Sequence, residues 1–109
     1  MRETHYNPFC KGKAIIRDYK DGKYGIMNTG GKIIISAKYD DEFHKYSEGM
    51  FVMRARGYGE YVMDINENII VPKDITSFFY GTYSDGLIAT YHDGYYNKKG
   101  EKLELKFEL

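Results

Sequence analysis

The sequence predicts an all-β protein built from stacked antiparallel β-hairpins. The first observation is a repeat, because the pentapeptide at 46–50 (Tyr-Ser-Glu-Gly-Met) returns 37 residues later at 83–87 (Tyr-Ser-Asp-Gly-Leu). The second is composition, because 12 Gly, 12 Tyr and 6 Phe among 109 residues are typical of short strands joined by tight turns. Repeated units of this size stack on their neighbours to bury a shared core.

The repeat extends in both directions from this pentapeptide. Residues 33–35 (Ile-Ile-Ile) recur at 69–71 (Ile-Ile-Val), 36 residues later. We therefore expect one domain over residues 1–109, with about two and a half copies of a unit of roughly 37 residues. The units are expected at 13–50, 51–87 and 88–109, in an open curved sheet or a small barrel-like sandwich.

Strands are expected in the short apolar segments between turn residues. Their predicted ranges are 13–19, 23–28, 32–36, 50–56, 60–64, 68–72, 76–80, 87–91, 94–97 and 102–107. The charged stretch 40–46 is expected to form a single turn or an irregular connection, because it is too short for a stable helix.

Turn chemistry supports the strand boundaries. Asp21-Gly22 and Asp93-Gly94 predict tight hairpins. Gly residues in the turns at 29–31 and 98–100 supply a backbone with positive φ. In the turn at 65–68, which has no Gly, we expect Asn to take that conformation.

Alternation along the strand at 50–56 predicts two different faces. Phe51, Met53 and Ala55 are expected to face the core, and the even-numbered residues from Met50 to Arg56 the other side. The continuous apolar runs 33–35 and 69–71 are expected to be covered on both faces.

Charge and hydropathy exclude several classes of protein. Sixteen basic and sixteen acidic residues give a net charge of zero, which argues against a generic binder of nucleic acid. No apolar run approaches the roughly 18 residues of a membrane span, and the first residues lack the apolar stretch of a signal peptide. Cys10 is the only cysteine, so an internal disulfide is excluded. We expect no membrane association and a cytoplasmic location.

No motif in the sequence predicts an enzyme. Cys10 has no His at a spacing that indicates a nucleophilic pair. The acidic cluster 40–42 with His44 lacks the Gly-centred loop of a calcium site, and it is better explained as a solvated turn. Gly57-Tyr58-Gly59 is a fragment of a phosphate-binding fingerprint, and no helix is predicted after it. We therefore expect no catalytic residue, no metal and no cofactor.

The order of the repeated elements resembles that of the bacterial WG-repeat proteins. The matching segments are 24–28 (Tyr-Gly-Ile-Met-Asn), 31–35 (Gly-Lys-Ile-Ile-Ile) and 46–50, and the resemblance covers about residues 13–109. The chain has no Trp, so Tyr24 stands at the Trp position of the family, and Glu60-Tyr61 and Asp93-Gly94 take the corresponding positions later. The resemblance implies an interaction module with no shared enzymatic activity and no catalytic residues.

The leading functional hypothesis is a non-catalytic module that binds another protein. Arg and Tyr dominate interface hot spots, because they bury a large area and still satisfy polar partners. The predicted partner-binding residues are Arg54, Arg56, Tyr58, Phe79, Tyr80 and Tyr83. A small inhibitor or immunity-type protein of bacterial or phage origin fits this class, and unpaired sheet edges could pair two copies of the chain.

Two other hypotheses remain open. Exposed Tyr rings could bind a carbohydrate or another small ligand, as they do in Tyr-rich cell-wall-binding repeats, although the absence of Trp counts against this. Stacked Tyr with Arg54 and Arg56 could bind single-stranded nucleic acid, although the balanced charge counts against that hypothesis.

Overall fold

The computed structural model describes residues 4–10, 12–55, 57, 59–74, 78–91 and 94–103. Every regular element in this part of the chain is a β-strand, which confirms the predicted fold class. The described strands form three four-stranded sheets, and none of these closes into a barrel. By its internal contacts the chain divides into two compact units, Met1–Phe43 and His44–Leu109.

The first unit contains one sheet, called here the first sheet, with the strand order β1-β2-β3-β4. Its strands are β1 (Thr4–Cys10), β2 (Lys13–Asp18), β3 (Lys23–Asn28) and β4 (Ile33–Tyr39). Strand β1 was not predicted, because its residues show no alternation. One signal for it exists: Phe9-Cys10-Lys11-Gly12 stands 37 residues before Tyr46-Ser47-Glu48-Gly49.

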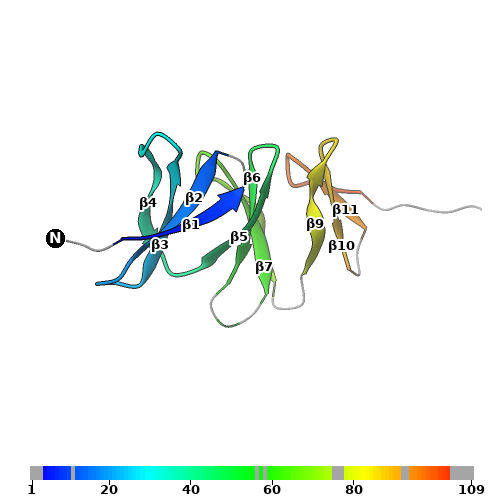
Figure 1. Cartoon of the computed structure of the whole chain (residues 1–109). Coiled ribbons are helices and arrows are strands. Elements are labelled where there is room, and N and C mark those ends of the chain that lie inside the picture. The colour runs from blue at the N-terminus through cyan, green and yellow to red at the C-terminus, as the bar shows by residue number, and fades with distance from the viewer. Residues whose placement is uncertain are drawn as a thin grey trace, which may run out of the picture. The chain divides into compact units, whose positions relative to one another are not determined.

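The second unit contains two sheets, which appear as separate groups of green and of yellow to orange strands in Figure 1. The second sheet consists of β5 (Glu42–Ser47), β6 (Met50–Arg54), β7 (Glu60–Asp64) and β8 (Ile69–Asp74). The third sheet consists of β9 (Phe79–Ser84), β10 (Leu87–Thr90), β11 (Tyr95–Asn97) and β12 (Lys102–Leu103). Each sheet is a meander, in which neighbours along the chain are neighbours in the sheet.

The prediction of a turn or irregular connection at 40–46 is wrong, because β5 occupies most of this stretch. The charged residues dominate the sequence pattern of this stretch, but two aromatic residues, Phe43 and Tyr46, hold the strand in place. The Phe43 side chain is 2% exposed, and the Tyr46 ring lies 4.7 Å from the ring of Phe51 on the neighbouring strand β6. The charge pattern therefore marks a strand with an exposed face rather than a solvated turn.

Two hairpins are closed by the repeated Ser-acid-Gly sequence, and we call these two-residue turns the corner turns. Glu48 and Gly49 join β5 to β6, and Asp85 and Gly86 join β9 to β10. All four residues have positive φ, between 52° and 82°. A type I′ hairpin turn requires positive φ at both central residues, and its twist matches that of the flanking strands.

The turn that follows the third strand of each sheet is closed by one side chain. The Oδ1 atom of Asn28, Asp64 or Asn97 accepts the backbone N–H groups two and four residues later, at 2.9–3.0 Å. The residue with positive φ in the middle turn is Glu67, at 69°, and not the Asn that the sequence predicted. Because Asp64 supplies the hydrogen bonds, the turn tolerates a residue that is unusual in this conformation.

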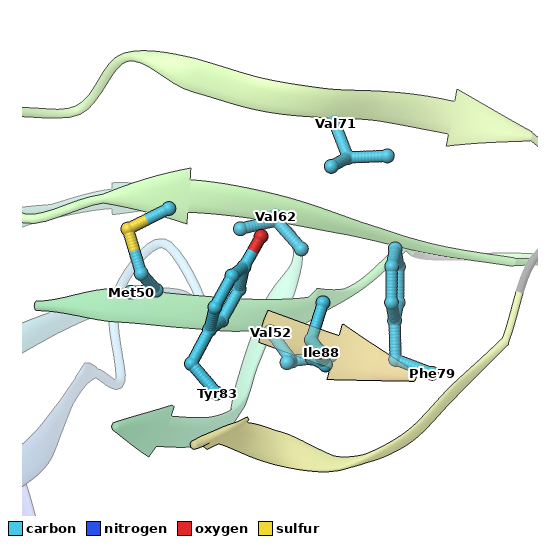
Figure 2. Close-up of a cluster of buried hydrophobic side chains, with 7 residues drawn as sticks. All are labelled: Met50, Val52, Val62, Val71, Phe79, Tyr83 and Ile88. Carbon is cyan, nitrogen blue, oxygen red and sulfur yellow. The ribbon is translucent and has the colours of Figure 1, made fainter. Parts of the chain in front are cut away.

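A buried cluster holds the third sheet against the second (Figure 2). Met50, Val52, Val62 and Val71 come from the second sheet, and Phe79, Tyr83 and Ile88 come from the third. Each of the seven is at most 5% exposed. At about 25 cal/mol for each Å² of apolar area removed from water, this cluster is the main favourable term that joins the two sheets.

Polar contacts at the corner turns add to this cluster. The Glu48 carboxylate accepts the backbone N–H groups of Asp85 at 2.8 Å and Gly86 at 2.9 Å. The Ser47 hydroxyl donates to the carbonyl oxygen of Tyr83 at 2.7 Å. The two backbone hydrogen bonds to Glu48, chiefly that from the Gly86 N–H, together with the Lys98 ammonium at 3.2 Å, hold the pKa of Glu48 below its ordinary value of 4.5. The side chains of Ser47 and Glu48 thus fix the position of the second corner turn by hydrogen bonds to its backbone.

Strand β6 is buried on both faces. The predicted core residues Phe51, Met53 and Ala55 are at most 5% exposed, which confirms that assignment. Met50 and Val52 on the opposite face are also buried, because the third sheet covers them. The expectation that the runs 33–35 and 69–71 are covered on both sides is wrong, since Ile33 is 56% and Ile69 is 54% exposed.

Candidate functional site

The structure separates the six predicted partner-binding residues. Tyr80 lies on the surface with 64% of its area exposed, and Arg54 is exposed as well. Phe79 and Tyr83 are each 2% exposed. Arg56 and Tyr58 lie outside the described residues. The predicted set is therefore not one continuous surface.

Phe79 and Tyr83 belong to the core rather than to a binding surface, which corrects the sequence prediction. Both point into the space between the second and third sheets (Figure 2). The Tyr83 hydroxyl donates to the carbonyl oxygen of Asn97 at 3.1 Å, and burial raises the pKa of Tyr83 to about 12. Alternation contained part of this information, because positions 79 and 83 share one face of a strand and position 80 takes the other, but it does not say which face is buried.

Arg54 has a structural partner that the sequence did not reveal. Its Nη2 donates to the Nε2 atom of His44 at 2.9 Å, and its Nε lies 3.9 Å from the Glu60 carboxylate. Glu60 is only 4% exposed, and its Oε1 accepts the backbone N–H of Phe79 at 2.8 Å. Because a buried carboxylate needs compensation by donors or cations, the Phe79 N–H and the Arg54 guanidinium help to hold the Glu60 carboxylate at the start of β9. His44 in turn accepts a hydrogen bond from Arg54.

Apolar side chains gather on the side of the third sheet that is turned away from the second, and we call this side the outer face. It consists of Phe78, Tyr80, Ala89, Tyr91, Tyr95 and Leu103. Four of the seven large apolar side chains that are exposed among the described residues belong to it. The rings of Tyr80 and Tyr91 meet edge to face, with centroids 5.3 Å apart and planes at 82°. This concentration of exposed apolar side chains makes the outer face the candidate contact surface among the described residues.

The strand register shows what kind of surface this is. Ala89, Tyr95 and Leu103 are cross-strand neighbours and form a row across β10, β11 and β12. The corresponding row of the second sheet is Val52, Val62 and Val71, each at most 3% exposed beneath the third sheet. The outer face therefore occupies the position that, one sheet earlier, is covered by another β-sheet.

Sequence reasoning missed Tyr91, Tyr95 and Leu103 as members of this surface. They lie on three different strands, and only the pairing of those strands brings them together. It also missed the linking role of Glu48. The signal was available, because a Ser-acid pair that recurs at a fixed spacing is well suited to join neighbouring repeats.

The described part of the chain contains no group of three His, Cys, Asp or Glu side chains that could hold a metal ion. Asp40, one member of the acidic cluster weighed from the sequence, instead forms an ion pair with Lys23 at 2.9 Å. Among the same residues there is no helix of the length and apolar character needed to cross a membrane.

Comparisons with protein-family models, with curated proteins and with solved structures give no match for this chain. The proposals below therefore depend on the residues and their geometry.

Proposed function

We propose that the protein is a non-catalytic module that binds another protein through the outer face of the third sheet. The observation that carries the proposal is the exposed pair Tyr80 and Tyr91, at 64% and 60%, on the same sheet face as the half-exposed Leu103. Tyr supplies a large apolar area with few rotatable bonds and a hydroxyl that can remain hydrogen-bonded at the rim, and it is enriched at interface hot spots. The resemblance to WG-repeat proteins implies the same class.

The chemistry of this face favours protein over the other two classes of partner. None of its six residues carries a charge, whereas a binder of single-stranded nucleic acid combines stacked rings with cationic side chains. The planes of Tyr80 and Tyr91 are nearly perpendicular, so the two rings do not form one flat platform for a sugar. Apolar contact with a complementary protein surface uses both rings as they stand.

The test is an affinity capture from nuclease-treated lysate of the host, with the full chain as bait. We compare the native chain with the double variant Tyr80→Ser/Tyr91→Ser. The matched control is Tyr19→Ser, which removes a Tyr that is 50% exposed in the first unit. We expect one stoichiometric protein that the native and control chains retain and the double variant loses. Far-ultraviolet circular dichroism must show that all three chains are folded.

Two outcomes would contradict the proposal. One is a partner retained equally by all three chains, which would place the binding surface elsewhere. The other is the absence of any captured protein together with binding of a glycan that the double variant abolishes, which would favour the carbohydrate hypothesis. Arg54→Glu is not a clean probe, because it would place a second carboxylate beside the buried Glu60.

A further inference from the structure

The outer face has the residue pattern of a sheet-packing face. Its equivalent in the second sheet, the row Val52, Val62 and Val71, packs against the third sheet with its side chains almost fully buried. Face-to-face sheets lie about 10 Å apart, and side chains from both sides fill this space. A surface with this pattern is suited to a second β-sheet more than to a helix or a flexible peptide.

A second copy of the chain can supply such a sheet without electrostatic cost. The six outer-face residues are uncharged, so two identical faces do not place like charges against each other. The chain as a whole has a net charge of zero, so two copies do not repel each other at long range. Among the described residues, the other large exposed apolar side chains are Tyr19, Ile33 and Ile69, and none of them lies on the third sheet. The complementary apolar surface on a second copy is therefore its own outer face.

We propose that the outer face of the third sheet binds the same face of a second copy, in a two-fold symmetric dimer. This inference rests on the proposed function and names the partner of the same surface. Two-fold pairing of one patch with itself is the commonest arrangement among homo-oligomers. The row of Ala89, Tyr95 and Leu103 lies at the centre of the contact, and Tyr80 and Tyr91 of each copy pack onto the row of the other.

The available area places this dimer among the small interfaces, which are mostly weak and transient. A fully buried aromatic side chain contributes roughly 150–250 Å², so Tyr80 and Tyr91, each about three-fifths exposed, offer on the order of 100–150 Å² apiece. With Phe78 and Leu103 the face offers on the order of 400 Å² per copy, about half of the roughly 800 Å² per partner in a standard interface. We therefore expect a weak, transient dimer.

The first experiment is analytical ultracentrifugation of the purified full chain from about 10 µM to about 1 mM. We expect the average mass to rise from the 12.7 kDa of one chain toward twice that value. Moderate salt should not weaken the association, because apolar contact is not screened. In Tyr80→Ser/Tyr91→Ser the dissociation constant should rise at least about tenfold, whereas Tyr19→Ser should leave it unchanged. A monomer throughout this range, or equal association of the double variant, would overturn the proposal.

A second experiment tests the two-fold geometry. Thr82 is an exposed residue of β9, and Thr82→Cys in a Cys10→Ser background carries a single spin label. This chain is mixed with isotopically labelled native chain at high concentration and observed by NMR. Broadening confined to residues of the third sheet supports the symmetric dimer. Broadening in the first sheet indicates head-to-tail contact and overturns it.

The two proposals can fail separately. If the chain stays monomeric but the lysate capture finds a partner that requires Tyr80 and Tyr91, the dimer is wrong and the protein-binding function stands. If the outer-face dimer forms and no other protein is captured, the dimer stands and the function becomes self-association. If neither result is obtained, both proposals are wrong.

Discussion

The two units use the same four-stranded meander, but only the second contains two sheets that are joined to each other. The third sheet is held to the second by the buried cluster and by the hydrogen bond between Glu60 and Phe79. Hydrogen bonds of Ser47 and Glu48 to the backbone at Tyr83, Asp85 and Gly86 add to these contacts. In the sequence, Cys10 and Lys11 stand 37 residues before Ser47 and Glu48.

This difference shows that different residues form the hairpin turn and join one sheet to the next. Gly12, Gly49 and Gly86 all have φ near 80°, so the Gly at this position has the same backbone conformation in all three sheets. A Lys side chain has no acceptor atom, so Lys11 cannot receive the two backbone N–H groups that Glu48 receives. A Lys at position 11 therefore cannot make the pair of hydrogen bonds with which Glu48 joins the second sheet to the third.

The largest expected effect tests whether the two units unfold independently of each other. Phe79→Ala removes a 2% exposed ring from the cluster of the second unit, at a cost of about 3–5 kcal/mol of unfolding free energy. Ile26→Ala removes a fully buried side chain from the first unit, at about 2–5 kcal/mol. Hydrogen exchange in mild denaturant, read by mass spectrometry, should show each loss of protection only in the unit that carries the change. Equal loss in both units would mean that the whole chain unfolds as one cooperative domain.

The second expected effect compares the same turn in two sheets. Gly31 and Gly100 both have positive φ, at 86° and 82°. A Cβ at Gly31 would meet no heavy atom within 4 Å, whereas a Cβ at Gly100 would collide with the carbonyl oxygen of Ile70 in the second sheet. We expect Gly31→Ala to cost about 1–2 kcal/mol, the strain of an L-residue in this conformation, and Gly100→Ala to cost at least about twice as much. Chemical denaturation measures the loss of unfolding free energy in both variants. Equal losses would show that the backbone near Gly100 moves away from Ile70 at little cost.

The smallest expected effect is a pH dependence confined to the second unit. The pKa of Glu48 is lower in the folded chain than its ordinary value of 4.5, so the folded state favours the carboxylate. Its contribution to stability is present above pH 4.5 and is lost as the pH falls through the depressed pKa. In Glu48→Gln the stability of the second unit should fall less over this range. The amides of Asp85 and Gly86 should also exchange faster at neutral pH in that variant, as NMR can show.

Lys98→Gln provides the control for that measurement. It removes the cation at 3.2 Å and leaves the two backbone hydrogen bonds of Glu48 in place. We expect a smaller change in the pH dependence than in Glu48→Gln, because the hydrogen bond from the Gly86 backbone is the largest cause of the lowered pKa. If Lys98→Gln changes the pH dependence as much as Glu48→Gln does, the contribution of Glu48 depends on its ion pair with Lys98 rather than on its backbone hydrogen bonds.

Local signals in the sequence were sufficient for most of the fold. The ranges 23–28 and 60–64 are the strands β3 and β7 as predicted, because Gly, Asn and Asp bound them on both sides. The strand predicted at 102–107 lies partly outside the described residues. The sequence did not predict β1, because its residues do not alternate, or β5, because many of its residues are charged. Both strands are stabilised by pairing with the next strand rather than by their own β-propensity.

The sequence by itself determined that the protein is all-β, where most of its turns fall, and that Tyr80 and Phe79 point to opposite faces of one strand. It could not determine which of these faces is covered, because alternation is the same for a buried face and an exposed one. Only the tertiary structure decided that Phe79 and Tyr83 lie beneath the second sheet and that Tyr80 remains exposed. The physical reason is that burial depends on contacts between strands far apart in the chain, and no local pattern records these contacts.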